Sequence, residues 1–225
     1  MTDAMRIIDL SHEIGAGFAA YPGLPAPVVD DYLGWEESHR TYCSGTEFRI
    51  GRITLVGNTG TYLDTPAHRY RDGFDLSALP LEVVVELPGV LVRTAARAIP
   101  SAAFAGIQVR DRAVLVSTGW CRHWETTRYG GAGHPYLTAG AADLLADRGA
   151  GLVGIDSVNI DDTSPASAGR RPAHSALLAA GIPIVEHLCD LEELDDGPFT
   201  FTAVPVKVKG LATFPVRAYA RQGPR

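Results

Sequence analysis

The chain has 225 residues, 46% hydrophobic and 20% charged, which is typical of a globular protein, and its length suits a single domain over residues 1–225 with a frayed tail at 221–225. The net charge of −6, without a basic stripe, argues against nucleic acid as a partner. Because the sequence shows neither a secretory signal nor an apolar stretch of about 18 residues, we expect a soluble cytoplasmic protein that does not bind membranes.

The first elements are short and are separated by turns. An apolar run at 6–10 predicts a strand, and Tyr-Pro-Gly at 21–23 predicts a turn, because proline fixes φ and glycine accepts a positive φ. Residues 28–45 show no clear periodicity. Apolar and polar residues then alternate over 48–56, which predicts a half-buried strand.

The loop after this strand carries side chains that can do chemistry. Residues 57–70 contain two glycines, a proline, an aspartate and a histidine. Gly57 and Gly60 allow the backbone to turn or to approach a ligand closely. Asp64 can bind a cation or accept a proton, and His68 can titrate near neutral pH. We therefore expect the functional site to be centred on this loop.

The second half of the chain alternates strands with helices. Hydrophobic patterns predict strands at 90–92, 113–116, 152–155, 182–185 and 199–208. Thr138 suits the N-cap of a helix that runs to Arg148, and a short helix is expected at 175–180. The strand at 152–155 places Asp156 at its carboxyl end, where open α/β sheets bind ligands, although Asp156 could also orient a loop.

The chain resembles the cyclase-like hydrolase superfamily, which includes bacterial kynurenine formamidases and isatin hydrolases. The loop pattern of that superfamily is His-x-Gly-Thr-His-x-Asp-x-Pro-x-His, and residues 58–68 here are Asn-Thr-Gly-Thr-Tyr-Leu-Asp-Thr-Pro-Ala-His. The segment from His174 to Glu186 resembles its second ligand block. The resemblance covers roughly residues 6–220 and implies one compact α/β domain with a mixed, barrel-like sheet and peripheral helices, the swivelling β/β/α cyclase-like fold.

Two departures from the pattern fall on metal ligands. Relatives with the full pattern hold one or two divalent ions, commonly zinc or manganese, and use the last loop histidine, here His68, as the acid/base group. Asn58 and Tyr62 replace the histidines of the first metal position, and an amide oxygen or a neutral phenol is a poor zinc ligand. We therefore expect that position to be empty. Three possible ligands for one zinc or manganese ion remain: Asp64, His174 and Glu186.

From the sequence we favour a metal-free site. Like charges in a partly buried pocket raise the pKa of one carboxyl group, which creates an acid/base pair. Tyr62 and Asn58 could donate hydrogen bonds to a carbonyl oxygen. Such a site suits cyclisation, dehydration, condensation or isomerisation of a small carbonyl or amide substrate in secondary metabolism. The expected catalytic residues are His68, Asp64, Glu186, His174 and Tyr62.

Two alternatives stay open: a single-metal hydrolase of an amide, lactam or ester, and an inactive binding protein that kept the pocket. Tyr21, Trp120 and Tyr136 are aromatic residues that would suit a planar substrate, and with Asn58 they form the expected substrate-binding set. The resemblance also implies a homodimer or homotetramer with sites near subunit contacts.

Overall fold

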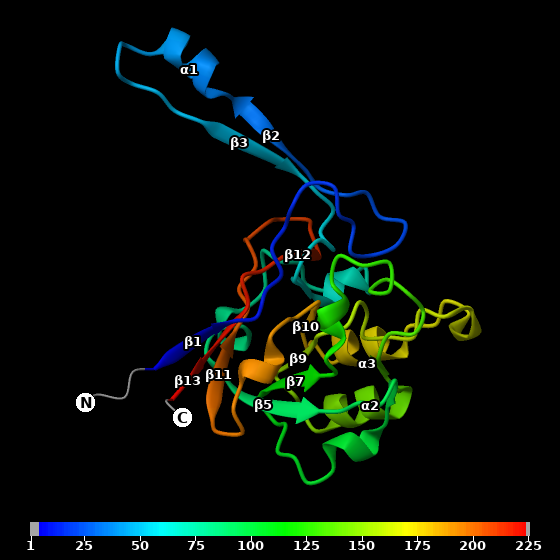
Figure 1. Cartoon of the computed structure of the whole chain (residues 1–225). Helices are drawn as coiled ribbons and strands as arrows, with labels where there is room; N and C mark the ends of the chain where they lie inside the picture. The colour runs from blue at the N-terminus through cyan, green and yellow to red at the C-terminus, as the bar shows by residue number, and fades with distance from the viewer. Residues whose placement is uncertain (1–4, 224–225) are drawn as a thin grey trace.

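A nine-stranded mixed sheet occupies the centre of the computed structural model, which describes residues 5–223 (Figure 1). In spatial order its strands are β1 (Arg6–Asp9), β13 (Tyr219–Gln222), β11 (Phe199–Thr202), β5 (Leu87–Arg93), β7 (Ala113–Ser117), β9 (Leu152–Ile155), β10 (Ile184–Glu186), β4 (Tyr62–Asp64) and β12 (Thr213–Pro215). The middle strands β5, β7, β9 and β10 are parallel, and the flanking pairs are antiparallel. The expected single compact α/β domain with a mixed, curled sheet is confirmed.

The sheet separates two hydrophobic cores. Along β7, Ala113 and Leu115 contribute to one core and Val114 and Val116 to the other, because successive side chains of a strand point to opposite faces. The second core is covered by α2 (Ala139–Asp147) and α3 (Pro172–Ala179). The first core draws its residues from both flanks of the sheet, which curls around it.

The helices that cover the sheet begin where local sequence favours helix starts. Thr138 is the N-cap of α2 and accepts a hydrogen bond from the Ala141 amide at 3.3 Å, as expected. The helix expected at 175–180 begins earlier, because Pro172 suits the first turn. The remaining short elements are η1 (Pro66–His68), η2 (Leu81–Val83), β6 (Ala98–Ile99), η3 (Ser101–Phe104), η4 (Trp120–His123), β8 (Tyr136–Leu137), η5 (Pro165–Ser167) and η6 (Leu191–Glu193).

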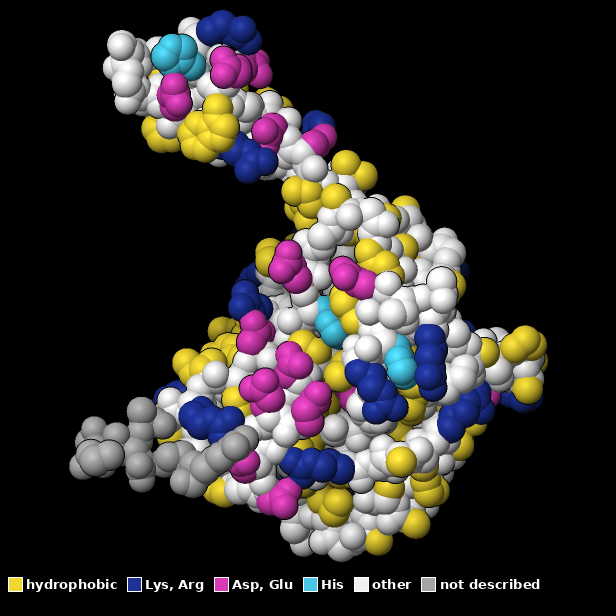
Figure 2. Space-filling view, viewed as in Figure 1, with side chains coloured by type: hydrophobic (Ala, Val, Ile, Leu, Met, Phe, Trp, Pro, Cys, Tyr) yellow, Lys and Arg dark blue, Asp and Glu magenta, His cyan; other side chains and the backbone are white. Residues whose placement is uncertain are grey.

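A hairpin projects from the body between β1 and β4 (Figure 1). It consists of β2 (Val28–Leu33), α1 (Trp35–Thr41) and β3 (Ile50–Thr54), and we call residues 28–54 the arm. A strand does form within 48–56, but the expectation that it is half-buried is wrong, because all five residues of β3 are exposed. Figure 2 shows hydrophobic side chains on the arm among charged ones.

The C-terminal strand corrects another expectation. Arg221 and Gln222, assigned above to a frayed tail, lie in β13, where they pair with Ile7 and Arg6 of β1. Residues 224–225 of that tail lie outside the described residues. The strand expected at 199–208 ends at Thr202. No helix within residues 5–223 combines the length and the apolar character needed to cross a membrane.

Candidate active site

The site is built on β4 and its two neighbours in the sheet. Strand register places Glu186 of β10 opposite Tyr62, and Thr213 of β12 opposite Asp64. Opposed residues point to the same face of a sheet, and so do residues two apart on one strand. Four polar side chains therefore gather on one face, and all four are buried.

Two glycines of the preceding loop allow this arrangement. A Cβ at Gly57 would lie 2.4 Å from the Thr213 carbonyl oxygen, so only glycine permits this close approach. Gly60 has a φ of +62°, which residues with a Cβ rarely adopt. The expected turn is confirmed at Gly60, whereas the close approach at Gly57 is to the backbone of β12. Pro66 then begins η1, which ends at His68.

Thr213 connects Asp64 with His68. Its hydroxyl donates to Asp64 Oδ1 and lies 2.9 Å from His68 Nδ1. Because the Thr213 hydroxyl donates its proton to the Asp64 carboxylate, it can only accept from His68. We therefore assign the His68 ring proton to Nδ1, which leaves Nε2 available. The second Asp64 oxygen, Oδ2, is buried and has no hydrogen-bond partner among the described residues.

His174 lies among three carboxylates. Its Nδ1 is 2.7 Å from Asp161 Oδ2, and its Nε2 is 3.6 Å from Asp64 Oδ2 and 3.8 Å from Glu186 Oε1. Asp161 also accepts the backbone amides of Ala173 and His174, which fixes it at the start of α3. Burial alone would lower the pKa of His174, but the hydrogen bond with Asp161 and the nearby carboxylates of Asp64 and Glu186 raise it to about 10.

Glu186 uses both carboxylate oxygens within the site. Oε1 accepts the Ile160 amide at 2.5 Å, and Oε2 accepts the hydroxyl of Tyr62. Burial raises the pKa of Glu186 to about 7, although the neighbouring His174 acts against this shift. Burial and the charge of Glu186 raise the pKa of Tyr62 well above its usual value. The Tyr62 hydroxyl thus donates to Glu186, which corrects the expectation that it donates to a substrate carbonyl.

A cavity of about 250 Å³ opens onto these side chains. The residues expected at the site that line it are Tyr21, Asn58, Tyr62, His68, His174 and Glu186. Asp64 lies beside this lining, 3.6 Å from both His68 and His174. The structure therefore brings together all five expected catalytic residues and two of the four expected substrate-binding residues.

Trp120 and Tyr136 do not line this cavity. Trp120 is buried in an aromatic cluster, where its Nε1 donates to the Tyr129 carbonyl oxygen at 3.0 Å. Tyr136 stacks with the Arg97 guanidinium and lines a separate depression. Their rings make packing and cation–π contacts outside the site instead. Asp156 accepts the Thr118 and Gly119 amides, so it orients a loop rather than reacting.

Sequence reasoning missed several residues of the site. Asp161 lies within the range that resembles the superfamily, roughly residues 6–220, but the sequence does not show that it contacts His174. Thr213 becomes part of the site only through its pairing with Asp64. Arg69 and Arg171 also line the cavity. In the sequence, only their positions next to His68 and near His174 could have indicated that they belong to the site.

One group of possible metal ligands lies in the described part of the chain. Asp64, His68 and His174 offer ligand atoms that all lie within 4.8 Å of one another. Glu186, expected in this set, has both oxygens occupied by other donors, whereas Asp64 Oδ2 has none. Asp161 orients His174 through Nδ1, as carboxylates commonly orient metal-binding histidines. The donor set therefore fits one divalent ion, provided that His174 releases its proton.

Known proteins share this fold and part of this sequence. The family model described as "Putative cyclase" matches residues 8–162. A kynurenine formamidase of Salinibacter ruber is 31% identical over 224 residues, 98% of this chain and 99% of its own length. Isatin hydrolase A from Labrenzia aggregata, solved with benzyl benzoate, superposes with a TM-score of 0.80 at 21% identity, covering 96% of this chain and 93% of its own.

A further solved structure is described as a potential metal-dependent hydrolase with cyclase activity. It has a TM-score of 0.78 at 24% identity and covers 97% of this chain and 98% of its own. At such identities the two solved structures support the fold, whereas the family model and the formamidase cover enough of the chain to define its family. The chain belongs to the cyclase family and is an enzyme of the hydrolase class.

Proposed function

We propose that this enzyme hydrolyses an amide, lactam or ester bond in a small carbonyl substrate. The observation that carries this proposal is the buried Asp64 carboxylate, one oxygen of which accepts no hydrogen bond from the described residues, with two histidines beside it at a small cavity. The relationship to a kynurenine formamidase, whose name describes hydrolysis of a formamide, supports the same class of reaction.

A zinc or manganese ion would be held by Asp64, His68 and His174. When bound, such an ion lowers the pKa of water and polarises the carbonyl group of a substrate. The fit rests on the Asp64 oxygen that accepts no hydrogen bond from the described residues and on the orientation of His174 by Asp161. The solved structural neighbour described as a potential metal-dependent hydrolase agrees with this assignment.

Glu186 is the group placed to hold a proton during hydrolysis. Burial raises the pKa of its carboxyl group, which favours the protonated form that a general acid requires. The Tyr62 hydroxyl and the Ile160 amide hold the carboxylate in one orientation beside the cavity. Asn58 lines the same cavity and offers an amide donor to the substrate carbonyl oxygen.

A second candidate is a metal-free proton-transfer reaction: cyclisation, dehydration, condensation or isomerisation. The observation that favours it is the position of His174 among Asp64, Asp161 and Glu186. A protonated imidazole there balances carboxylate charge without a metal ion. His68, with Nε2 available, would then be the acid/base group rather than a ligand.

Metal analysis paired with turnover separates the two candidates. The protein is purified without a metal-affinity step, and hydrolysis of formanilide and phenyl acetate is followed before and after chelation. We expect near-stoichiometric zinc or manganese that is lost in His174→Ala, and hydrolysis that stops with chelator and returns with added metal. Chelator-resistant hydrolysis by metal-free protein would refute the metal assignment but not hydrolysis itself. Absence of hydrolysis from a wide panel of amides, lactams and esters would refute the first candidate and favour the second.

A further inference from the structure

The cavity also carries two arginines that the proposed hydrolysis does not use. Arg69 follows η1, and Arg171 immediately precedes α3; both line the cavity together with His68 and His174. Ser175 joins the two segments, because Arg69 Nε donates to Ser175 Oγ at 3.2 Å and this hydroxyl donates to the Arg171 carbonyl oxygen at 2.7 Å. Two cationic side chains thus line the cavity from two segments that Ser175 connects.

Within residues 5–223, neither guanidinium forms an ion pair with a carboxylate. Arg171 donates through Nη1 to the carbonyl oxygens of Asp162 and Arg170, and its Nη2 makes no hydrogen bond there. Arg69 donates only through Nε and lies over the Tyr70 ring at 5.3 Å. Guanidinium groups with free N–H donors match the geometry of a carboxylate, which accepts two hydrogen bonds side by side.

The acidic side chains of the site are more deeply buried than the two arginines. Asp64, Asp161 and Glu186 are fully buried, whereas Arg69 is exposed and Arg171 is partly buried, so the guanidinium groups form the outer rim of the cavity. In both candidate reactions the carbonyl group must reach the buried residues, which leaves the arginines for another substituent of the substrate. Tyr21 and Leu24 also line the cavity and provide apolar contact. This arrangement suits a molecule that has a reactive carbonyl towards the buried residues and an anionic group towards solvent.

We propose that Arg69 and Arg171 form an anion site that selects carbonyl substrates bearing a carboxylate. The reaction at the carbonyl rests on the proposed hydrolysis, but the anion site itself can be tested without turnover. A carboxylate at the rim receives charge-assisted hydrogen bonds from the guanidinium groups, and the cavity of about 250 Å³ limits the ligand to roughly one ring with its substituents.

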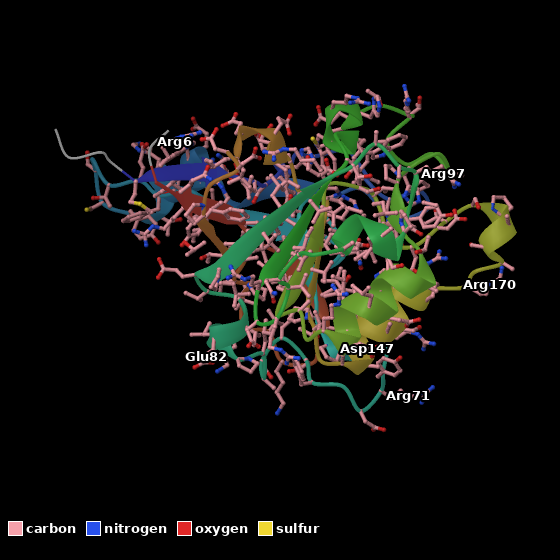
Figure 3. The ribbon with its side chains drawn as sticks, turned by 90° about the horizontal axis from the view of Figure 1, so that it is seen from below. Arg6, Arg71, Glu82, Arg97, Asp147 and Arg170 are labelled. Carbon is pink, nitrogen blue, oxygen red and sulfur yellow. The ribbon has the colours of Figure 1, made fainter. Side chains whose placement is uncertain are left out.

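Equilibrium binding of 2-aminobenzoate, with the neutral 2-aminobenzamide as its match, tests the anion site. We expect the carboxylate to bind the wild-type protein at least about tenfold more tightly than the amide. Arg69→Gln and Arg171→Gln should each weaken carboxylate binding about tenfold and leave amide binding unchanged. Arg170→Gln is the matched control, because Arg170 lies on the projecting loop after η5 and does not line the cavity (Figure 3).

Three results would overturn the anion site: equal wild-type affinity for the two probes, equal loss of both in the variants, or a carboxylate preference that survives both substitutions. Hydrolysis of 2-formamidobenzoate and formanilide keeps this test apart from that of the proposed function. If the arginines select the carboxylate but neither compound is hydrolysed, the anion site stands and hydrolysis fails. If both are hydrolysed without any carboxylate preference, hydrolysis stands and the anion site fails.

Discussion

Asp161 determines how His174 faces the cavity. Its carboxylate accepts from His174 Nδ1 and from the first amides of α3, so one side chain fixes both the imidazole and the helix start. The remaining nitrogen, Nε2, can then point only towards Asp64 and Glu186. Loss of the Asp161 charge should therefore affect the site more than the fold, because the helix amides can still bond to an amide oxygen.

We predict that Asp161→Asn lowers kcat/KM about 10- to 100-fold and weakens metal binding by a similar factor, because a second carboxylate no longer orients the imidazole. Asp162→Asn is the matched control, since Asp162 is the next residue and pairs with Arg97 outside the cavity. Steady-state kinetics, metal titration and urea denaturation are measured for both variants. Equal losses in the two, or a loss of stability without a change in metal affinity, would contradict this role.

The site residues that could be identified from the sequence share one property: they are titratable side chains at positions that match a known motif. Asp64, His68, His174 and Glu186 were found in this way, and they do meet in the structure. Thr213 could not be found, because a threonine on a late strand acquires its role only from the register that places it opposite Asp64. Sequence order alone does not contain that register.

At the scale of elements, the close approach of the loop to β12 connects stability with the site. The Gly57 backbone lies against the Thr213 carbonyl oxygen, and Thr213 holds both Asp64 and His68. Any side chain at 57 must push β12 away from β4, which separates the Thr213 hydroxyl from its two partners. Element pairing and catalytic geometry therefore change together.

We predict that Gly57→Ala destabilises the protein by about 1–3 kcal/mol, as overpacking does, and lowers turnover with it. Gly140→Ala is the control: an added Cβ there meets nothing within 4 Å, and alanine in a helix should stabilise by about 0.5–1 kcal/mol. Chemical denaturation and kinetics compare the two. Wild-type stability and activity in Gly57→Ala would contradict the proposed link between the position of β12 and the geometry of the site.

The strand predictions were correct where the apolar residues of the sequence pattern are buried in the structure. They were incomplete where those residues are exposed. The continuous apolar run of β7 is buried on both faces, as expected for a central parallel strand. The alternation at 48–56 predicted a strand correctly, but its apolar side has no cover within the described residues of the chain. Periodicity shows that one side of a strand is apolar, not what lies against it.

At the scale of the whole molecule, the arm needs an explanation. A two-stranded hairpin is only marginally stable by itself in water. Large apolar side chains on the arm are nevertheless half exposed or more: Val28, Tyr32, Trp35, Phe48 and Ile53. Surface of this kind commonly marks a protein interface. The arm therefore supports the expectation of a homodimer or homotetramer, which we propose is assembled through it.

We predict that the wild-type protein has a mass in solution at least twice that of the 24.0 kDa chain, and that Ile53→Asp shifts it towards the monomer. A charge placed in a buried apolar contact loses hydration without gaining a partner, so association should weaken at least tenfold. Leu81→Asp is the control, because Leu81 is similarly exposed but lies on the body. Light scattering after size exclusion measures all three proteins. A monomeric wild type, or equal dissociation of the two variants, would assign the apolar surface of the arm to something other than a second copy of this chain.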